Sequence, residues 1–160
     1  MGGAIQDSTV CLRLIGGDLD PEEVTRLLGC APTRAWRKGD VREDPRYHIL
    51  QRTGVWSLDS DTDRSVPLDE QIRALIARVP ADSAVWEALA RRFDIDVFCG
   101  IHLDEWNRGC GFGPDLLRRL GEMKAALDLD IYGPDETIPP GLTRFLSRPS
   151  PGGESRPPSG

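Results

Sequence analysis

The sequence contains no hydrophobic run that approaches the roughly 20 residues of a membrane-spanning helix. Its first residues, MGGAIQDSTV, have neither the basic region nor the apolar core of a secretory signal. Gln6 stands where an N-myristoylation signal needs serine or threonine. We therefore expect a cytoplasmic protein that does not associate with a membrane.

Basic residues are outnumbered, with 20 Lys and Arg against 26 Asp and Glu among 160 residues. Nucleic acid binding draws much of its affinity from neutralising phosphates with basic side chains. A net charge of -6 and a pI near 4.9 therefore argue against a nucleic acid partner. A basic protein would be the electrostatically easier partner.

Cysteine and histidine are scarce, with four and two residues, and no Cys-x-x-Cys pair occurs. Wide spacing of the cysteines predicts reduced, mostly buried thiols. Cys99, His102 and Cys110 come closest to a metal-binding cluster. Cys99 and His102 are three residues apart on a predicted strand, so their side chains point to opposite faces and we expect no metal there.

Hydrophobic periodicity divides most of the chain into strands and helices. Strands are predicted at 8–16, 33–40, 54–60, 94–104 and 127–133, and helices at 20–29, 67–80, 82–93 and 113–123. Asp20 is the expected N-cap of the first helix and Gly29 its C-terminal glycine. Pro45 argues against regular structure in the polar stretch 41–53, where we expect a mobile loop.

The strands each have one apolar and one mixed face, a pattern that predicts an α+β fold. We expect a mostly antiparallel sheet with helices packed on one face. The similar segments PEEVTRLLG and PDLLRRLG each follow a strand, which suggests a ferredoxin-like two-layer sandwich. Residues 1–133 are expected to form this single domain, and the Pro/Gly/Ser-rich residues 134–160 a disordered tail.

The acidic segment DSDTDRSVPLDE resembles a calcium-binding loop in its spacing, with candidate ligands Asp59, Asp61, Asp63 and Glu70. Arg64 stands where the sharp turn of such a loop needs glycine, and the preceding element is a predicted strand instead of a helix. We favour a solvated acidic loop that leads into a helix, with calcium as the alternative. No cofactor is expected.

Several segments together resemble the bacterial family called domain of unknown function 4279. They include LDPEEVTRLLGCAPTRAWRKGD, VFCGIHLDEWNRGCGFGPDLLRRLGEM and LDLDIYG, and the resemblance spans about Ser8 to Gly133. Its most specific parts are RAWRKGD, with Trp36, and DEWNRG, with Asn107 and Gly109. The resemblance implies a small bacterial cytoplasmic domain and identifies no catalytic residue.

An open sheet face would gather aromatic and charged side chains into a platform for a ligand or partner. The candidate binding residues are Arg13, Trp36, Arg37, Phe98, His102, Trp106, Asp130 and Tyr132. The outward-facing Asp96, Asp128 and Asp130 are interpreted as solvated edge residues, not as a catalytic pair. The two aromatics Phe98 and Tyr132 are equally compatible with packing under the 41–53 loop or against a second copy in a homodimer.

The leading functional hypothesis is a non-enzymatic module that binds a protein or small-molecule ligand, such as an immunity-type binder of a basic toxin. The alternative is a small-molecule or hydrolytic enzyme that uses the open face around His102. Cys11 or Cys110 would be its nucleophile, since no Gly-x-Ser-x-Gly elbow is present. We assign no catalytic residue from the sequence.

Overall fold

Five strands form one sheet in the computed structural model, which describes residues 2–43 and 45–134. In sheet order they are β3 (Arg34–Trp36), β6 (Gly54–Asp59), β2 (Asp7–Gly16), β7 (Asp94–His102) and β9 (Ala126–Tyr132). Two short pairs flank it: β1 (Gly3–Ala4) with β8 (Arg108–Gly109), and β4 (Val41–Glu43) with β5 (His48–Leu50). The predicted tail, apart from Pro134, lies outside the described residues.

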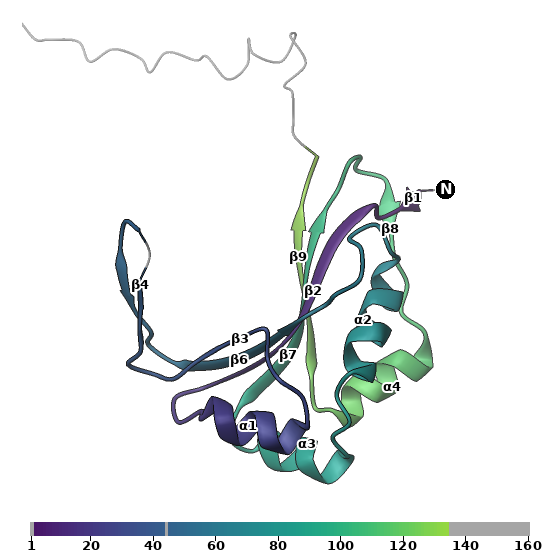
Figure 1. The fold of residues 1–160 in the computed structure, drawn as a ribbon. Helices are drawn as coiled ribbons and strands as arrows, with labels where there is room; N and C mark the ends of the chain where they lie inside the picture. The colour runs from purple at the N-terminus through teal and green to yellow at the C-terminus, as the bar shows by residue number, and fades with distance from the viewer. Residues whose placement is uncertain (1, 44, 135–160) are drawn as a thin grey trace, which may run out of the picture.

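Four helices lie on one side of the sheet in the described part of the chain (Figure 1). They are α1 (Pro21–Leu28), α2 (Leu68–Ala77), α3 (Ser83–Ala90) and α4 (Pro114–Glu122). Within the five-stranded sheet, neighbouring strands are antiparallel except for β7 and β9, which are parallel. The predicted α+β fold, with a mostly antiparallel sheet and one helix layer, is confirmed.

The ferredoxin-like arrangement is not confirmed. The split βαβ unit of that fold joins parallel strands through a helix. Here the chain leaves β2, forms α1 and returns through β3 to β6, which pairs directly with β2 in the antiparallel sense. The similarity between the α1 and α4 sequences therefore reflects two helices that each follow a strand, not a repeated ferredoxin unit.

Local signals placed the start of each helix within one residue of its prediction, but α2 and α3 end three residues early, at Ala77 and Ala90. The Asp20 carboxylate accepts the Glu22 backbone N–H at 3.0 Å, and Gly29 ends α1 with φ of +72°. Only glycine adopts such a backbone without steric cost, which explains the stop. Asp82 caps α3 by accepting the Val85 N–H at 3.0 Å.

The core lies between the helices and one face of the sheet. Leu12 and Leu14 of β2 are fully buried beneath the helices, and Trp56 of β6 is buried beside them. The indole N–H of Trp56 donates to the Thr25 hydroxyl at 3.0 Å, which ties α1 to β6 and satisfies a buried donor. The other face of the sheet carries no helix among the described residues.

The prediction that residues 41–53 have no regular structure is wrong. Val41 pairs with Leu50, and Glu43 with His48, in the β4–β5 hairpin. This hairpin stands out from the body on the side away from the helices (Figure 1). Pro45 lies between the two strands, where its missing N–H interrupts no ladder, so the argument from proline did not apply.

An ion pair ties α2 to α4. The Arg73 guanidinium donates to both Asp115 oxygens, at 2.5 and 3.1 Å. This pairing lowers the pKa of Asp115 from 3.8 to about 2. Because the folded pKa lies below the ordinary one, the stabilisation is present above about pH 4 and is lost as the pH falls toward 2.

We expect Arg73→Gln to raise the pKa of Asp115 from about 2 toward 3.8, because its main cation is removed. A carboxyl NMR titration of Asp115 measures this directly. Arg118→Gln is the matched control, since Arg118 contacts Glu122 instead. An Asp115 pKa that does not change in Arg73→Gln would contradict the tie.

Candidate functional site

Arg13 stands at the centre of the open sheet face. Its strand β2 pairs with β7 so that Arg13 is directly opposite Asp96. The guanidinium donates to both Asp96 oxygens, at 2.8 and 2.7 Å, and lies over the Phe98 ring at 4.3 Å. Asp128 of β9 is 4.0 Å from the same guanidinium. The hydrogen bonds that Arg13 donates to Asp96 raise the pKa of Arg13, which keeps it charged.

A second group lies at the other end of the open face. The His102 and Tyr132 rings are stacked, with centroids 4.8 Å apart and planes 12° apart. The parallel register of β7 and β9 places these two residues side by side. The Tyr132 hydroxyl donates to Asp130 at 2.5 Å, and this bond raises the pKa of the phenol.

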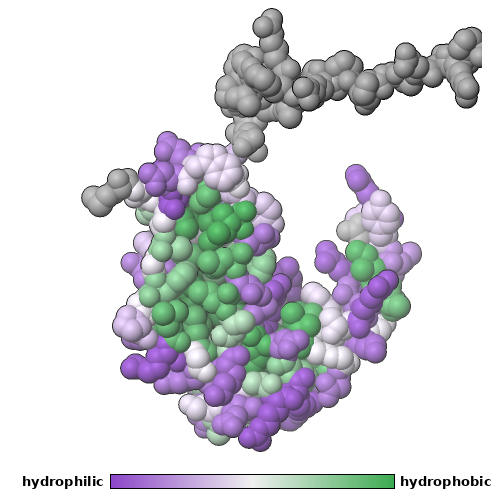
Figure 2. All heavy atoms as spheres, turned by 180° about the vertical axis from the view of Figure 1, so that it is seen from behind, coloured by the Kyte–Doolittle hydropathy of each residue, from purple (hydrophilic) through white to green (hydrophobic). Residues whose placement is uncertain are grey.

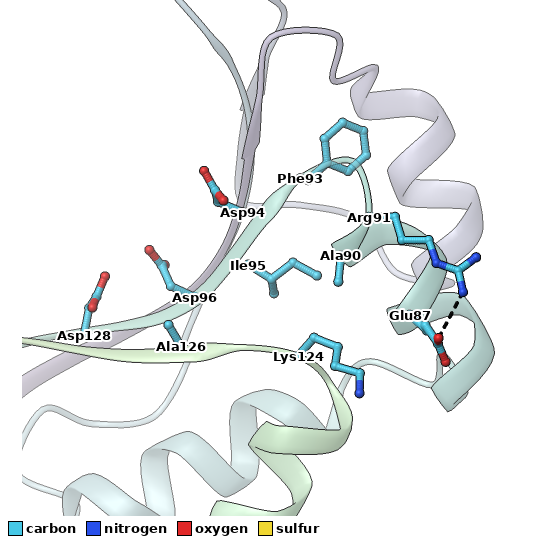
Figure 3. A pocket seen from close by; sticks show the side chains of 10 residues that line it. All are labelled: Glu87, Ala90, Arg91, Phe93, Asp94, Ile95, Asp96, Lys124, Ala126 and Asp128. Atoms are coloured by element: carbon cyan, nitrogen blue, oxygen red, sulfur yellow. Dashed lines mark hydrogen bonds and ion pairs between the residues drawn. The ribbon is translucent and has the colours of Figure 1, made fainter.

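Aspartates form a row on the open face near the start of β9. Asp94 and Asp96 of β7 point to the same side as Asp128 of β9 (Figure 3). All three line a hollow of about 630 Å³ at the end of the sheet, which is also lined by Lys124 and by Glu87, Ala90 and Arg91 at the C-terminal end of α3 (Figure 3). In the described part of the chain Asp94 makes no ion pair, so its charge faces solvent without compensation.

The structure brings most of the predicted binding residues onto this face. Arg13 and Phe98 form one group, and His102, Asp130 and Tyr132 the other. Trp36 lies on the same face at the opposite edge, because it pairs with Val55 of β6. Its indole nitrogen is buried and has no hydrogen-bond partner within the described ranges.

Arg37 lies away from these groups, whereas Trp106 lies beside Gly133, the residue that follows Tyr132. The Arg37 guanidinium binds Asp20 at 2.5 Å, at the N-terminus of α1. Trp106 is 66% exposed and lies against Gly133, so closely that a side chain at position 133 would collide with it. The Trp106 ring therefore packs against the chain where β9 ends. The strand pattern could not reveal this contact, because it joins two segments that are far apart in the sequence.

Asp96 was interpreted as a solvated edge residue, and the structure corrects this. Its side chain is only 14% exposed and is paired with Arg13. The alternation of β7 had placed it on the open face. Its partner on β2 could not be identified because the register between two strands that are distant in sequence is a tertiary property.

The calcium alternative is not supported. Asp59 accepts from Arg34 at 3.0 Å, and Asp61 lies 3.6 Å from Arg78. Asp63 accepts from the Ser65 N–H and hydroxyl, which lowers the pKa of Asp63. The three carboxylates thus turn to different partners. No group of three or more metal-ligand residues converges within residues 2–43 and 45–134.

Among the described residues, no hydrogen bond joins His102 to Cys11 or Cys110. Cys11 is opposite Phe98, whereas His102 is opposite Asp7, four residues further along β7 and thus about 13 Å away. Burial raises the pKa of the Cys11 thiol despite the opposing effect of Arg13, which disfavours a reactive thiolate. Burial also raises the pKa of Cys110.

The side chains of Cys99 and His102 point to opposite faces of β7, so the cluster of Cys99, His102 and Cys110 cannot bind one zinc ion. Cys99 is fully buried on the helix side of β7, and burial raises the pKa of its thiol to about 12. His102 is exposed on the other side of the same strand. His102 lines neither the hollow beside Asp94 nor the 300 Å³ hollow beside Cys11.

These features define an α+β domain with a helix layer on one side of its sheet and a charged, aromatic face on the other. Residues 6–134 match the family model described as Domain of unknown function (DUF4279). The chain belongs to this family, as the resemblance indicated. No curated protein and no solved structure matches it. Among the described residues, no helix has the length and apolar character needed to cross a membrane.

The Arg13–Asp96 pair should stabilise the open face measurably. We expect Arg13→Ala to lower the free energy of unfolding by about 1–3 kcal/mol, because it leaves the largely buried Asp96 carboxylate without its donor. Arg13→Lys should restore only part of this loss, since an ammonium cannot make both bonds of the guanidinium fork. Urea denaturation measures both effects.

Arg91→Ala is the control for these variants. Arg91 is exposed at the C-terminal end of α3 and pairs with Glu87, so we expect a change below about 0.5 kcal/mol. Removing both partners in Arg13→Ala/Asp96→Ala should recover part of the lost stability, since no unpaired carboxylate remains. Native stability in Arg13→Ala would show that the pair contributes nothing.

Proposed function

We propose that this chain is a non-enzymatic binding module that takes a basic protein or peptide on the open face of its sheet. The observation that carries the proposal is the row of aspartates on β7 and β9, which lies beside Phe98 on the side of the sheet opposite the helices (Figure 1). Such a face has no role in the core, and its composition suits recognition of cationic side chains.

The charges on this face support a basic partner. Arg13 compensates Asp96 and lies at 4.0 Å from Asp128, but Asp94 and Asp130 form no ion pair with any described residue. The hollow is lined by four acidic residues, Glu87, Asp94, Asp96 and Asp128, against the two basic residues Arg91 and Lys124, so negative charge is in excess there. Complementary charge speeds encounter with a partner and selects against acidic competitors.

The aromatic residues support direct contact as well as steering. Tyr132 is about half exposed, and its ring is held by the stack on His102 and the bond to Asp130. A ring that is already held loses little conformational freedom on binding. Lysine and arginine can also lie over an aromatic face, which adds a cation–π contribution.

The β4–β5 hairpin supports a partner that is contacted from two sides. It stands on the open side of the sheet, and a gap separates it from the body (Figures 1 and 2). The hairpin region exposes four large hydrophobic side chains, which are Val41, Tyr47, Ile49 and Leu50. A partner seated on the sheet would be within reach of this apolar surface.

A titration followed by ¹H–¹⁵N NMR tests the proposal, with nonalysine as the basic probe and nonaglutamate as its acidic counterpart. We expect nonalysine to shift the amides of β7 and β9, more strongly at low salt, and nonaglutamate to shift none. Shifts confined to the helix side would contradict the proposal.

Matched variants sharpen this test. Asp128→Asn should weaken nonalysine binding about fivefold, equivalent to ~1 kcal/mol for one exposed ion pair. Glu122→Gln removes the same charge from α4, on the helix side, and should leave binding unchanged. His102→Ala should fold normally, because its ring is exposed. Equal weakening by Asp128→Asn and Glu122→Gln would show that only net charge matters.

A further inference from the structure

The outer edge of β9 is unpaired. β9 is the last strand of the sheet, with β7 on one side and no strand on the other among the described residues. Proteins usually blunt or cover such an edge, since its free N–H and C=O groups can pair with another chain. The seven residues of β9 match the length of an ordinary strand.

The free backbone groups of β9 belong to its apolar residues. The Tyr132 carbonyl accepts from the Leu103 N–H at 2.9 Å, so the backbone of Tyr132 points toward β7. Backbone polar groups alternate in direction along a strand. Those of Leu127, Leu129 and Ile131 therefore point away from β7, to the open edge.

The same edge has an uncovered apolar face. Leu129 is level with Cys99, and Ile131 with Ile101, so both lie on the helix side of the sheet. Cys99 and Ile101 are buried, but Leu129 is 42% and Ile131 57% exposed. From behind, Figure 2 shows hydrophobic side chains gathered in one continuous area over this part of the molecule.

The opposite face of the edge is acidic. Asp128 and Asp130 alternate with the apolar residues and project from the open face. In an antiparallel pairing, residues without mutual hydrogen bonds lie closest, with Cα atoms about 4.5 Å apart. Asp128 and Asp130 would occupy these close positions, because their own backbone groups point toward β7.

We propose that the free edge of β9 binds an extended segment of a partner protein in which apolar residues alternate with lysine or arginine. The segment adds antiparallel to β9, with its apolar side chains beside Leu129 and Ile131 and its cations beside Asp128 and Asp130. Backbone bonds provide affinity, and alternate side chains provide specificity. This inference rests on the proposed function, from which it takes the basic character of the partner. What it adds is the mode of binding, namely strand addition at the edge of the sheet.

Charge decides against a second copy as the occupant. Two copies paired about Leu129 would place each Asp128 opposite an Asp130 in the closest pairs of the ladder. Like charges that are directly opposite are destabilising. A partner strand with cations at these positions removes the repulsion and keeps the apolar contacts.

A designed peptide tests the proposal on the full chain. Its sequence is acetyl-Thr-Val-Lys-Val-Lys-Val-Thr-amide, and binding is measured by calorimetry. N-methylation of the central valine removes a donor that faces β9, and we expect affinity to fall at least about tenfold. N-methylation of either lysine alters an N–H that points away and should leave affinity nearly unchanged.

Charge exchange is the second arm. Replacing both lysines of the peptide by glutamate should abolish binding to the native chain. Asp128→Lys should weaken binding of the lysine peptide and restore binding of the glutamate peptide. Glu122→Lys, on α4, is the matched control and should change the affinity for neither peptide. Amide exchange at Leu129 and Ile131 should slow when the lysine peptide is bound.

Four outcomes would overturn strand addition at this edge. The first is equal affinity for the peptides methylated at valine and at lysine. That result would exclude strand addition but would not contradict binding of nonalysine to the open face. The second is loss of binding on N-methylation of lysine alone. In a parallel pairing the lysine N–H groups would face β9, so this result would indicate a parallel strand. Slow exchange at Leu129 in the free monomer would assign the edge to this chain's own residues 135–160, and a dimer in sedimentation would assign it to a second copy.

Discussion

The antiparallel pairing of β2 with β7 is the constraint on which the rest of the structure depends. β2 is the central strand, and its register with β7 runs from Asp7 opposite His102 to Ile15 opposite Asp94. One face of this pair provides the floor of the core, including Leu12 and Leu14. The other face places Arg13 opposite Asp96. A shift of one residue would exchange the two faces and bury charges beneath the helices.

A single helix layer makes the two faces of the sheet different in kind. The covered face satisfies the hydrophobic requirement of the fold, and the uncovered face is free to carry Arg13, Asp96 and the His102–Tyr132 stack. The helix layer also leaves the C-terminal part of β9 uncovered. Leu127 packs against the core, but Leu129 and Ile131 further along β9 do not. The acidic face and the apolar edge therefore meet on the same strand.

Local signals were sufficient for most elements. Asp20 and Gly29 bound α1 because capping and positive φ act within a few residues. The alternation in β7 correctly separated Cys99 from His102. Local signals failed at the β4–β5 hairpin, where Pro45 lies between the strands, and at the strand order, because propensity carries no information on which strands are neighbours.

The sequence by itself determined which side chains share a face, since alternation is a property of every strand. It thereby placed Arg13, Phe98, His102, Asp130 and Tyr132 together in advance. Only the tertiary structure decided that Arg13 binds Asp96, that Arg37 binds Asp20, and that β9 is an edge. These properties depend on register and on the extent of the helix layer, which arise from contacts between residues far apart in the chain.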